Sequence, residues 1–408
     1  MIRFHVLVLF FSFFYVSQSF AAKVVFYLNF EGETHHHHEH SHKGSGFKVE
    51  TVGIGNKTIS LKRSFAPEET KKQFFIGIVD VPAGAYGSIS LNGKSYTLSP
   101  SLSLKDNSVK AVFIKMKDEN VQVFPQNILS VSKKQFFSIP SLDALGVIDE
   151  DSGFIVGFIG FPHSPYGLTV LDGKIYTGFE NGQIAEVNTE NGFWSGAVSI
   201  ADVSLENRFL SSDRKIYIPE KGQNTICYFC PETGARFVVS TDGRIKDAFY
   251  IKKTGYLLVA TENPSSVYLL SGGSGKIIST VSFPGDIVSV TGDDRFVYAA
   301  DKEGKAIYRY SFNQKSIESF PVFESPLIVR SFEDFLFLAS KSNLVVLNKA
   351  TVSPYVVFNI RDVKEMSLSS DGRKVFVFTG KNTYYVINLD SLYVEASGDT
   401  PGLVFQAD

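Results

Sequence analysis

The chain has 408 residues, and its 40 lysines and arginines nearly balance its 42 aspartates and glutamates, which leaves a formal net charge of -2. This balance gives no reason, over the whole sequence, to expect nucleic acid or an anionic membrane as a partner. Hydrophobic residues make up 44% and charged residues 20%, which excludes a disordered chain. Aromatic residues reach 14%, with 37 Phe and 18 Tyr, and such residues suit the half-buried face of a β-sheet. The composition therefore favours an all-β fold, with room for two or three domains.

The first residues have the order of a secretory signal peptide. Arg3 precedes an apolar run from Val6 to Val16, and polar residues then lead to Ala21 and Ala22. Cleavage between these two alanines would define residues 1–21 as the signal. The run is too short to span a bilayer, which needs about 20 apolar residues. We therefore expect a periplasmic or secreted protein with no integral membrane segment after cleavage, and an uncleaved N-terminal anchor is the alternative.

Residues 22–125 contain short strand-like runs but no long repeat. The expected strands are 23–30, 47–52, 58–63, 73–79, 88–91, 108–116 and 120–124. Turn residues such as Asn92-Gly93 separate several of them. Short strands without helical periodicity predict a small β-sandwich domain that ends near Pro125.

A histidine-rich segment, residues 34–46, interrupts this domain. The predicted metal ligands in it are His35, His36, His37, His38, Glu39, His40 and His42. Imidazole nitrogen binds zinc, nickel and copper, so the segment predicts a site for one of these ions. Glycines flank the run, and we expect a loop of modest affinity and low selectivity. The alternatives are a solvated insertion with incidental metal affinity, and a pH-responsive loop, since imidazoles titrate near pH ~6.5.

From Gln126 onward the chain repeats itself. A basic or small anchor followed by a hydrophobic run recurs every 39 to 41 residues, at Lys134, Lys174, Lys215, Gly255, Arg295, Asp334 and Lys374. A second strand-like run follows each anchor, at 144–148, 183–188, 225–229, 266–270, 306–310, 343–347 and 384–389. Four short strands per repeat of about forty residues are typical of one propeller blade. The repeats predict a seven-bladed β-propeller over residues 126–408, with six or eight blades as alternatives, and Gly402–Phe405 as the strand that completes the first blade.

The last repeat has the clearest signature. Ser369–Val377 places a Ser-Ser-Asp-Gly turn before a strand, and Tyr384–Asp390 follows as a second strand. These segments resemble the YVTN-type β-propeller repeat, in which a Ser-Pro-Asp-Gly turn precedes a Tyr-Val strand and a later Val-Ile-Asp run. Leu145–Asp149 and Asn224–Ile226 fit the same pattern, whereas Ser370 stands where the family favours Pro. The resemblance implies the propeller fold for about two thirds of the chain but no particular activity, because such repeats serve many functions.

Other candidate residues have ordinary structural explanations. His163 is the only histidine in the repeat region and no G-x-S-x-G elbow accompanies it, so we interpret it as a loop residue. Cys227 and Cys230 are the only cysteines, and in an extended strand they lie about 10 Å apart, beyond disulfide reach. An unbridged pair is therefore favoured over a local disulfide. Gly272–Gly275 links two expected strands, which makes it a hairpin rather than a phosphate-binding loop. No catalytic residue is assigned.

These features favour a non-enzymatic binding or scaffold protein. We expect its propeller to present loops to a protein or cell-surface ligand, while the histidine-rich loop binds zinc, nickel or copper. The alternative is an enzyme or cofactor-binding propeller with a site in the axial funnel, built from loop carboxylates and His163. Convergent polar side chains in a deep axial pocket would favour that alternative, whereas exposed apolar patches would favour the scaffold. A structural protein of the cell surface is a third hypothesis.

Overall fold

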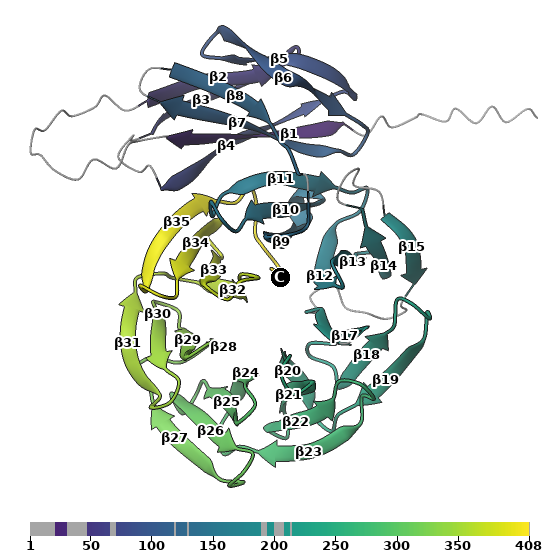
Figure 1. Cartoon of the computed structure of the whole chain (residues 1–408), viewed down its shortest axis with the longest axis vertical. Coiled ribbons are helices and arrows are strands. Elements are labelled where there is room, and N and C mark those ends of the chain that lie inside the picture. The colour runs from purple at the N-terminus through teal and green to yellow at the C-terminus, as the bar shows by residue number, and fades with distance from the viewer. Residues whose placement is uncertain are drawn as a thin grey trace, which may run out of the picture.

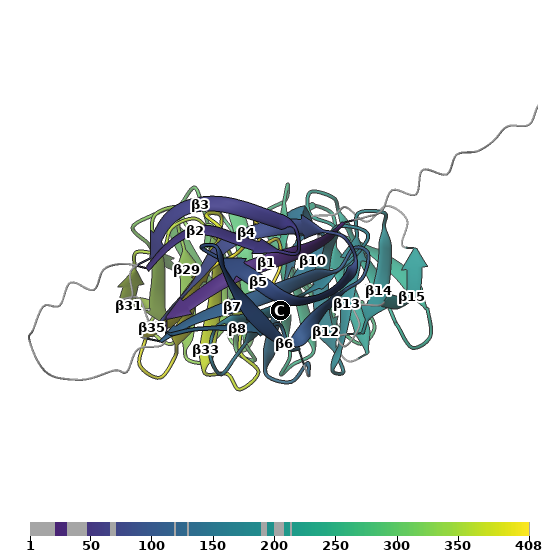
Figure 2. The ribbon, with the colours of Figure 1, turned by 90° about the horizontal axis from the view of Figure 1, so that it is seen from above.

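The computed structural model describes residues 21–30, 47–65, 71–117, 120–128, 130–188, 194–199, 208–212 and 214–407. Regular structure in these residues is β-strand, apart from one 3-10 turn, Pro140–Leu142. Figure 1 shows a ring of sheets with further sheets lying against its rim, and Figure 2 shows the same arrangement from above. No helix in this part of the chain is long and apolar enough to cross a membrane. The all-β prediction is confirmed.

The N-terminal region forms two sheets. One has the strand order β4-β1-β7-β8 and the other β3-β2-β5-β6. The bounds are β1 (Ala22–Phe30), β2 (Phe47–Ile54), β3 (Lys57–Phe65), β4 (Lys72–Val81), β5 (Gly84–Leu91), β6 (Lys94–Leu104), β7 (Val109–Lys117) and β8 (Asn120–Pro125). Phe26, Val52 and Leu102 belong to one buried cluster that draws on both sheets. The two sheets therefore share a hydrophobic core.

Strand β6 has no counterpart among the expected strands of this region. Pro100 and four serines interrupt its apolar pattern between Lys94 and Leu104. Leu98, Leu102 and Leu104 are nevertheless buried in the core of the two sheets. The expected set was incomplete because three spaced leucines are a weak signal beside polar residues and a proline.

Strand β1 is buried on both of its faces. Val24, Phe26 and Leu28 face the core of the two N-terminal sheets, whereas Val25 and Tyr27 belong to a cluster shared with the ring. A strand covered on both sides needs apolar residues at successive positions rather than at alternate ones. This requirement explains the nearly continuous apolar run of β1, and it places β1 between the two parts of the molecule.

The ring is a succession of antiparallel sheets taken in chain order (Figure 1). The first is three-stranded: β9 (Lys134–Ile139), β10 (Ala144–Asp149) and β11 (Ile155–Gly160). The next are four-stranded: β12 (Pro165–Leu171), β13 (Lys174–Phe179), β14 (Gln183–Val187), β15 (Trp194–Ser199); β16 (Leu210–Ser212), β17 (Lys215–Pro219), β18 (Thr225–Phe229), β19 (Arg236–Ser240); β20 (Arg244–Ile251), β21 (Tyr256–Glu262), β22 (Ser266–Ser271), β23 (Ile277–Ser282).

The remaining sheets complete the ring. They are β24 (Ile287–Gly292), β25 (Phe296–Asp301), β26 (Ala306–Ser311), β27 (Ile317–Pro321); β28 (Ile328–Phe332), β29 (Phe335–Ala339), β30 (Leu344–Asn348), β31 (Ser353–Phe358); and β32 (Val363–Leu368), β33 (Lys374–Thr379), β34 (Thr383–Asn388), β35 (Tyr393–Asp399). Strand β35 pairs in parallel with β4, which joins this last sheet to the N-terminal one. From Lys174 on, each expected anchor lies at, or one residue before, the start of the second strand of a sheet.

Hydrophobic clusters connect each ring sheet to the next. Leu257 and Tyr228, for example, share a cluster between two consecutive sheets, and Phe337 and Val377 share another. The same holds between the last and first sheets, where Phe378 packs against Phe137 with ring centroids 5.2 Å apart. Four-stranded sheets that pack face to face around a closed ring define a propeller-like fold.

Two glutamine side chains fasten the N-terminal region to β11. Gln73 of β4 donates to the carbonyl of Ile155 at 3.0 Å and accepts from its amide at 2.9 Å. Gln126, which follows β8, makes the equivalent pair with Phe158 at 3.0 and 2.9 Å. A primary amide carries one donor and one acceptor group, as a peptide group does. Each glutamine therefore takes the place of a neighbouring strand at the outer edge of the first ring sheet.

The C-terminal tail returns to the first ring sheet. The amide of Ser138 donates to the carbonyl of Gln406 at 2.9 Å, and the amide of Phe405 donates to the carbonyl of Ser138 at 3.3 Å. Phe137 and Ala407 form an isolated antiparallel bridge. The expectation of a strand over Gly402–Phe405 was wrong in its position, because the pairing is made by residues 405–407 and is too short for a regular strand. The tail nevertheless lies on the free side of β9.

Gln406 also joins the two following sheets. Its Oε1 accepts from the amides of Leu168 at 3.0 Å and Phe209 at 3.2 Å, and its Nε2 donates to the carbonyls of the same two residues. The residue is 3% exposed. The Gln406 side chain thus satisfies backbone groups at the inner edges of two consecutive sheets. The Gln406 carbonyl accepts a hydrogen bond from Ser138 of the first ring sheet.

Candidate functional site

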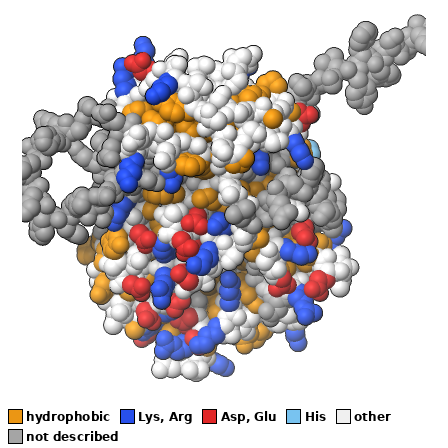
Figure 3. All heavy atoms as spheres, turned by 45° about the horizontal axis from the view of Figure 1, so that its top comes forward, with side chains coloured by type: hydrophobic (Ala, Val, Ile, Leu, Met, Phe, Trp, Pro, Cys, Tyr) orange, Lys and Arg blue, Asp and Glu red, His pale blue; other side chains and the backbone are white. Residues whose placement is uncertain are grey.

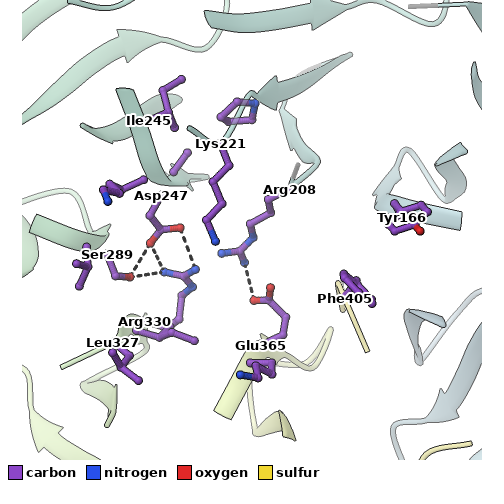
Figure 4. A pocket seen from close by; sticks show the side chains of 16 residues that line it. Tyr166, Arg208, Lys221, Ile245, Asp247, Ser289, Leu327, Arg330, Glu365 and Phe405 are labelled. Carbon is purple, nitrogen blue, oxygen red and sulfur yellow. Dashed lines mark hydrogen bonds and ion pairs between the residues drawn. The ribbon is translucent and has the colours of Figure 1, made fainter. Parts of the chain in front are cut away.

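The inner strands of the ring enclose an axial cavity of about 190 Å³ (Figure 4). Its lining comes from β12, β20, β24, β28 and β32, from the segments beside β16 and β17, and from the tail. The charged lining residues are Arg208, Lys221, Lys246, Asp247, Arg330, Lys364 and Glu365. Polar side chains from sheets far apart in sequence therefore converge on the axis.

Besides β12, whose pairing register shifts within Pro165–Leu168, three inner strands contain a β-bulge where they reach the cavity. The pairing register shifts within Ile245–Asp247 of β20, within Ile287–Ser289 of β24 and within Val363–Glu365 of β32. The middle and last residues of each range line the cavity. A bulge sets two residues against one on the partner strand and changes the direction of the side chains. The same local irregularity thus directs two consecutive side chains toward the axis in each of three sheets.

Arg330 of β28 is at the centre of the cluster. Its Nη1 donates to Asp247 Oδ2 at 2.8 Å and its Nη2 donates to Asp247 Oδ1 at 3.2 Å. Nη1 also donates to Ser289 Oγ at 3.0 Å and to the carbonyl of Val329 at 2.9 Å. The Ser289 hydroxyl in turn donates to Asp247 Oδ2 at 2.6 Å. This bidentate pair is held from three strands, and the two charged side chains are only 5% and 12% exposed.

The environment keeps both members of this pair ionised. Burial acts to raise the pKa of the Asp247 carboxyl, but the charge and hydrogen bonds of Arg330 outweigh it and hold that pKa below its ordinary value. Burial acts to lower the pKa of Arg330, and the charges of Asp247 and Glu365 raise it above the usual value. A paired carboxylate with a low pKa is a poor general acid or base near neutral pH. Asp247 is therefore better suited to holding the Arg330 guanidinium in place than to proton transfer.

Two further cations lie at the same place. Arg208, just before β16, forms an ion pair between its Nη2 and Glu365 Oε1 at 3.4 Å. Lys221, just after β17, has its backbone bridged to Ile245 of β20. Figure 4 shows the Lys221 ammonium pointing toward the Arg208 guanidinium, beside the Asp247–Arg330 pair. Five of the seven charged residues that line the cavity are thus cationic.

One side of the cavity is apolar. Tyr166 and Phe405 form an edge-to-face ring pair with centroids 5.6 Å apart. Phe405 is 41% exposed and Leu327, which also lines the cavity, is 38% exposed. Figure 4 shows the two rings beside one another, to one side of the charged cluster. Apolar surface and cationic groups therefore face the same space.

A second cavity, of about 560 Å³, shares Arg208 and Arg330 with the first. Gln406 and Ala407 line it, whereas Phe405 lines the first cavity. Its other charged residues have both signs: Lys252, Lys253, Asp293, Asp294, Arg295, Glu333, Asp334 and Lys349. Acidic and basic side chains also alternate over the face of the ring seen in Figure 3. With Arg208 and Arg330 included, six cations and four anions line this larger cavity.

The predicted metal ligands, His35, His36, His37, His38, Glu39, His40 and His42, lie outside the described residues. Within the part of the chain that is described, no group of three or more His, Cys, Asp or Glu side chains is placed to hold a metal ion. The metal site stays a prediction.

His163 lies away from the axial cluster. It belongs to the loop between β11 and β12, and its ring centroid is 6.3 Å from that of Phe179. The adjacent Ser164 hydroxyl donates to Asp143 Oδ1 at 2.7 Å. Among the described residues that line the two cavities, His163 does not occur. The axial role considered for it is therefore not supported, and the structural interpretation fits.

No disulfide joins Cys227 and Cys230. Cys227 is buried on β18, and its thiol donates to Glu220 Oε1 at 3.5 Å. Cys230 follows the strand, where a hydrogen bond with the Thr233 side chain lowers the pKa of its thiol. The arrangement agrees with the strand geometry, which separates residues three apart beyond disulfide reach.

Sequence reasoning missed Arg208, Asp247 and Arg330. A signal was present for Arg330, which is the one charged residue in the strand segment Ile328–Phe332. The signal for Asp247 was weaker, because its strand, Arg244–Ile251, also contains Arg244 and Lys246. A charged residue in the middle of a buried strand needs a partner or a function. What the sequence lacked was the information that these two positions meet, since 83 residues separate them.

The fold and the axial geometry define a β-propeller-like all-β protein. No family model matches the chain, and no curated protein matches it. Among solved structures, it is similar to BamB from Moraxella catarrhalis, with a TM-score of 0.45 and 15% sequence identity, over 68% of this chain and 92% of that chain. The YVTN-type repeat and the blade count stay predictions.

Proposed function

We propose that this is an exported, non-enzymatic binding and scaffold protein, in which a seven-bladed propeller is preceded by a β-sandwich over residues 22–125. The observation that carries the proposal is the exposure of large apolar side chains on outer strands and on one loop. These are Val238 of β19, Ile278 of β23, Tyr355 and Val357 of β31, Tyr393 of β35, and Phe323 between β27 and β28. Exposed apolar groups along sheet edges are typical of protein-binding surfaces.

Phe323 and Tyr355 are the strongest features of this surface. Phe323 is 94% exposed in the loop that enters β28, and Tyr355 is 66% exposed on the outer strand β31. On β31, Tyr355 and Val357 point outward, whereas Val356 and Phe358 pack on the core. The strand thus offers an apolar outer face together with an edge without a further strand in its sheet. A partner protein would bury both.

Site-specific photocrosslinking tests this surface. A photoreactive phenylalanine at Phe323 or at Tyr355, in the full chain expressed in its own host, should give one discrete crosslinked partner. The same probe at Lys315, an exposed turn residue, is the matched control. Replacing Val357 by lysine should abolish the crosslink from position 355 without lowering the unfolding temperature by more than a degree or two. Crosslinks from positions 323 and 355 no stronger than those from position 315 would contradict the proposal.

The histidine-rich loop is proposed to bind zinc, nickel or copper in the periplasm or outside the cell. The support is its composition, six imidazoles and one carboxylate within His35–His42. The test is a calorimetric titration of each ion into the mature protein and into a version that lacks His35–His42. Saturable binding that is lost with the loop is expected. Equal binding by both proteins would remove the loop from the proposal.

The axial cluster favours a ligand site as a second candidate function. Polar side chains converge there, which is the feature expected of an axial funnel site. Both carboxylates in the cavity are engaged by arginines, Asp247 by Arg330 and Glu365 by Arg208. With its acids used in this way, the cavity is better suited to binding than to acid–base catalysis. Assay of the purified protein against hydrolase and dehydrogenase substrate panels, expected to be negative, tests this distinction.

A further inference from the structure

The outer strands of the ring sheets differ in how their edges are protected. An uncovered edge strand offers unpaired backbone groups to other strands, and proteins block such edges with cover, charges or prolines. The edge of β11 is occupied by the side chains of Gln73 and Gln126, and β35 pairs with β4. Three further outer strands carry a charge, a proline or both: Arg236 on β19, Glu318 and Pro321 on β27, and Pro354 on β31.

Strand β23 differs from these outer strands. It lies at the end of its sheet, and its six residues, Ile277–Ser282, include no charge and no proline. Four of them are β-branched, and five of the six are exposed, Ile278 by 50%. A bulge beside its first residues is shared with β31, so it does not set β23 apart. Short, uncharged segments of high β-propensity without proline are the ones that pair with copies of themselves.

The backbone groups of Thr280 and Ser282 point away from the ring sheet. The amide of Phe283 donates to the carbonyl of Ser265 at 3.1 Å, in register with the pairing of β23 and β22. Bonded and non-bonded positions alternate along an antiparallel strand, so Ser282 and Thr280 face outward. In the described part of the chain, no backbone hydrogen bond outside the sheet uses these outward groups. Two donors and two acceptors are therefore open to a further strand.

The place of β23 in the ring gives a second molecule access to this edge. Figure 1 shows β23 on the rim of the ring, on the side opposite the N-terminal sheets. The outer strands of the two adjacent sheets, β19 and β27, expose Val238 by 59% and Ile317 by 39%. A molecule that pairs with β23 would therefore meet further apolar surface on both sides of the strand.

The composition of β23 fits a second copy of the same strand. Opposite residues of an antiparallel pair lie on the same face, so a two-fold axis between two copies passes through one residue. An axis at Thr280 sets residues 278–282 against the same residues of the copy in reverse order. An axis at Val281 would instead bring Pro284, which has no amide hydrogen, opposite Ile278. With the axis at Thr280, a Thr–Thr pair forms and no charge meets a like charge.

The size of this junction predicts a weak association. A strand of six residues is about 20 Å long, so the contact belongs to the interfaces that bury less than ~1,200 Å². Interfaces of this size are typical of transient complexes rather than of obligate dimers. We therefore expect monomer and dimer to exchange, with a dissociation constant of about 1–100 μM.

We propose that two copies of this chain associate through antiparallel pairing of β23, about a two-fold axis at Thr280, which joins two four-stranded sheets into one. The inference rests on the proposed binding function, since Ile278 belongs to the same exposed set, and it names one partner for that surface. The dimer carries the N-terminal sheets at its two far ends and presents Phe323 and Tyr355 twice. A bivalent scaffold holds a multivalent partner more tightly than a single copy does.

Sedimentation equilibrium of the full mature protein, from about 1 to 200 μM, tests the association. The unaltered protein should fit a monomer–dimer equilibrium. Thr280→Lys sets two like charges against each other at the axis, and it should weaken the association about tenfold or more. Ser319→Lys is the matched control, because Ser319 is an exposed hydroxyl residue of β27 opposite Tyr308, as Thr280 is of β23 opposite Tyr268. The control should associate as the unaltered protein does, and both variants should keep its unfolding temperature.

Disulfide crosslinking tests the register of the pairing. In a background with Cys227→Ser and Cys230→Ser, Thr280→Cys should form a disulfide-linked dimer on mild oxidation, because bonded opposite residues have Cα atoms ~5.5 Å apart. Ser282→Cys should not, since the two copies of that residue lie ~14 Å apart in this register.

Three results would overturn the proposal. They are a monomer at every concentration, an unchanged association in Thr280→Lys, and equal crosslinking of Ser282→Cys and Thr280→Cys. A photoreactive phenylalanine at position 280, in the full chain in its own host, should give a product of twice the mass of the chain. A product of any other mass would show that a different protein occupies β23 and would also overturn it. The crosslinks from positions 323 and 355 do not involve β23, so this proposal and the proposed function can fail separately.

Discussion

Replacing Gln406 by alanine should destabilise the whole ring. The side-chain amide makes four hydrogen bonds with the backbones of Leu168 and Phe209, three of them at 2.9 to 3.2 Å. Leu168 is 0% exposed and Phe209 4% exposed, so water does not readily replace the lost partner. At a net ~0.5–1.5 kcal/mol for each hydrogen bond, the free energy of unfolding should fall by about 2–6 kcal/mol.

Urea unfolding followed by far-ultraviolet circular dichroism measures this loss. Gln314→Ala is the matched control, because Gln314 lies on an exposed turn and should change the free energy by less than about 0.5 kcal/mol. Truncation after Asp399, which removes the whole tail, should cost at least as much as Gln406→Ala. An unfolding midpoint for Gln406→Ala that equals the midpoint for Gln314→Ala would refute the bridging role of Gln406.

Three further results are expected. Asp247→Asn should lower the free energy of unfolding by about 3 kcal/mol, because it leaves Arg330 buried without its counter-ion. The pKa of Asp247 is lowered in the folded protein, so its ionised carboxylate stabilises the fold above about pH 4, and this stabilisation is lost as the pH falls through the folded pKa. The urea midpoint should therefore depend less on pH between about pH 2 and 6 in the variant than in the unaltered protein. Thiol titration of the denatured, unreduced protein should find both Cys227 and Cys230 reactive, and a result of none would show a disulfide. Gln73→Ala should increase protease cleavage between the N-terminal sheets and the ring, and an unchanged cleavage pattern would show that the glutamine contact is dispensable.

The sequence predicted the repeating part of the fold well, for a physical reason. Strands such as Ile175–Phe179 and Val375–Thr379 are buried between neighbouring sheets, so each repeat needs the same apolar run at the same phase. Features that occur once gave no such signal. Four of the eleven residues of strand β6 are serines, and the tail acts through Phe405, Gln406 and Ala407, whose partners are fixed only by closure of the ring.

The candidate site was much less predictable. Arg330 is visible as the one charge in its strand and Asp247 as one of three charges in its own, but periodicity does not reveal that the two face each other. Lys246 and Lys364 reach the cavity because of β-bulges. A bulge depends on how two strands pair in the folded protein, and the sequence of one strand does not show this. Local composition pointed instead to the histidine-rich segment, because clustered imidazoles are recognisable without knowledge of the fold.

The contacts of the tail determine when the molecule can finish folding. Gln406 meets Leu168 across 238 positions of the chain, and Tyr384 meets Gln73 across 311. Contacts between such distant segments form slowly, and synthesis delivers the N-terminal partners first. The first ring sheets therefore keep inner backbone groups hydrated until residues 405–407 have been synthesised and can pair with them. A nascent chain in this state is more exposed to proteases and to aggregation than the folded protein is.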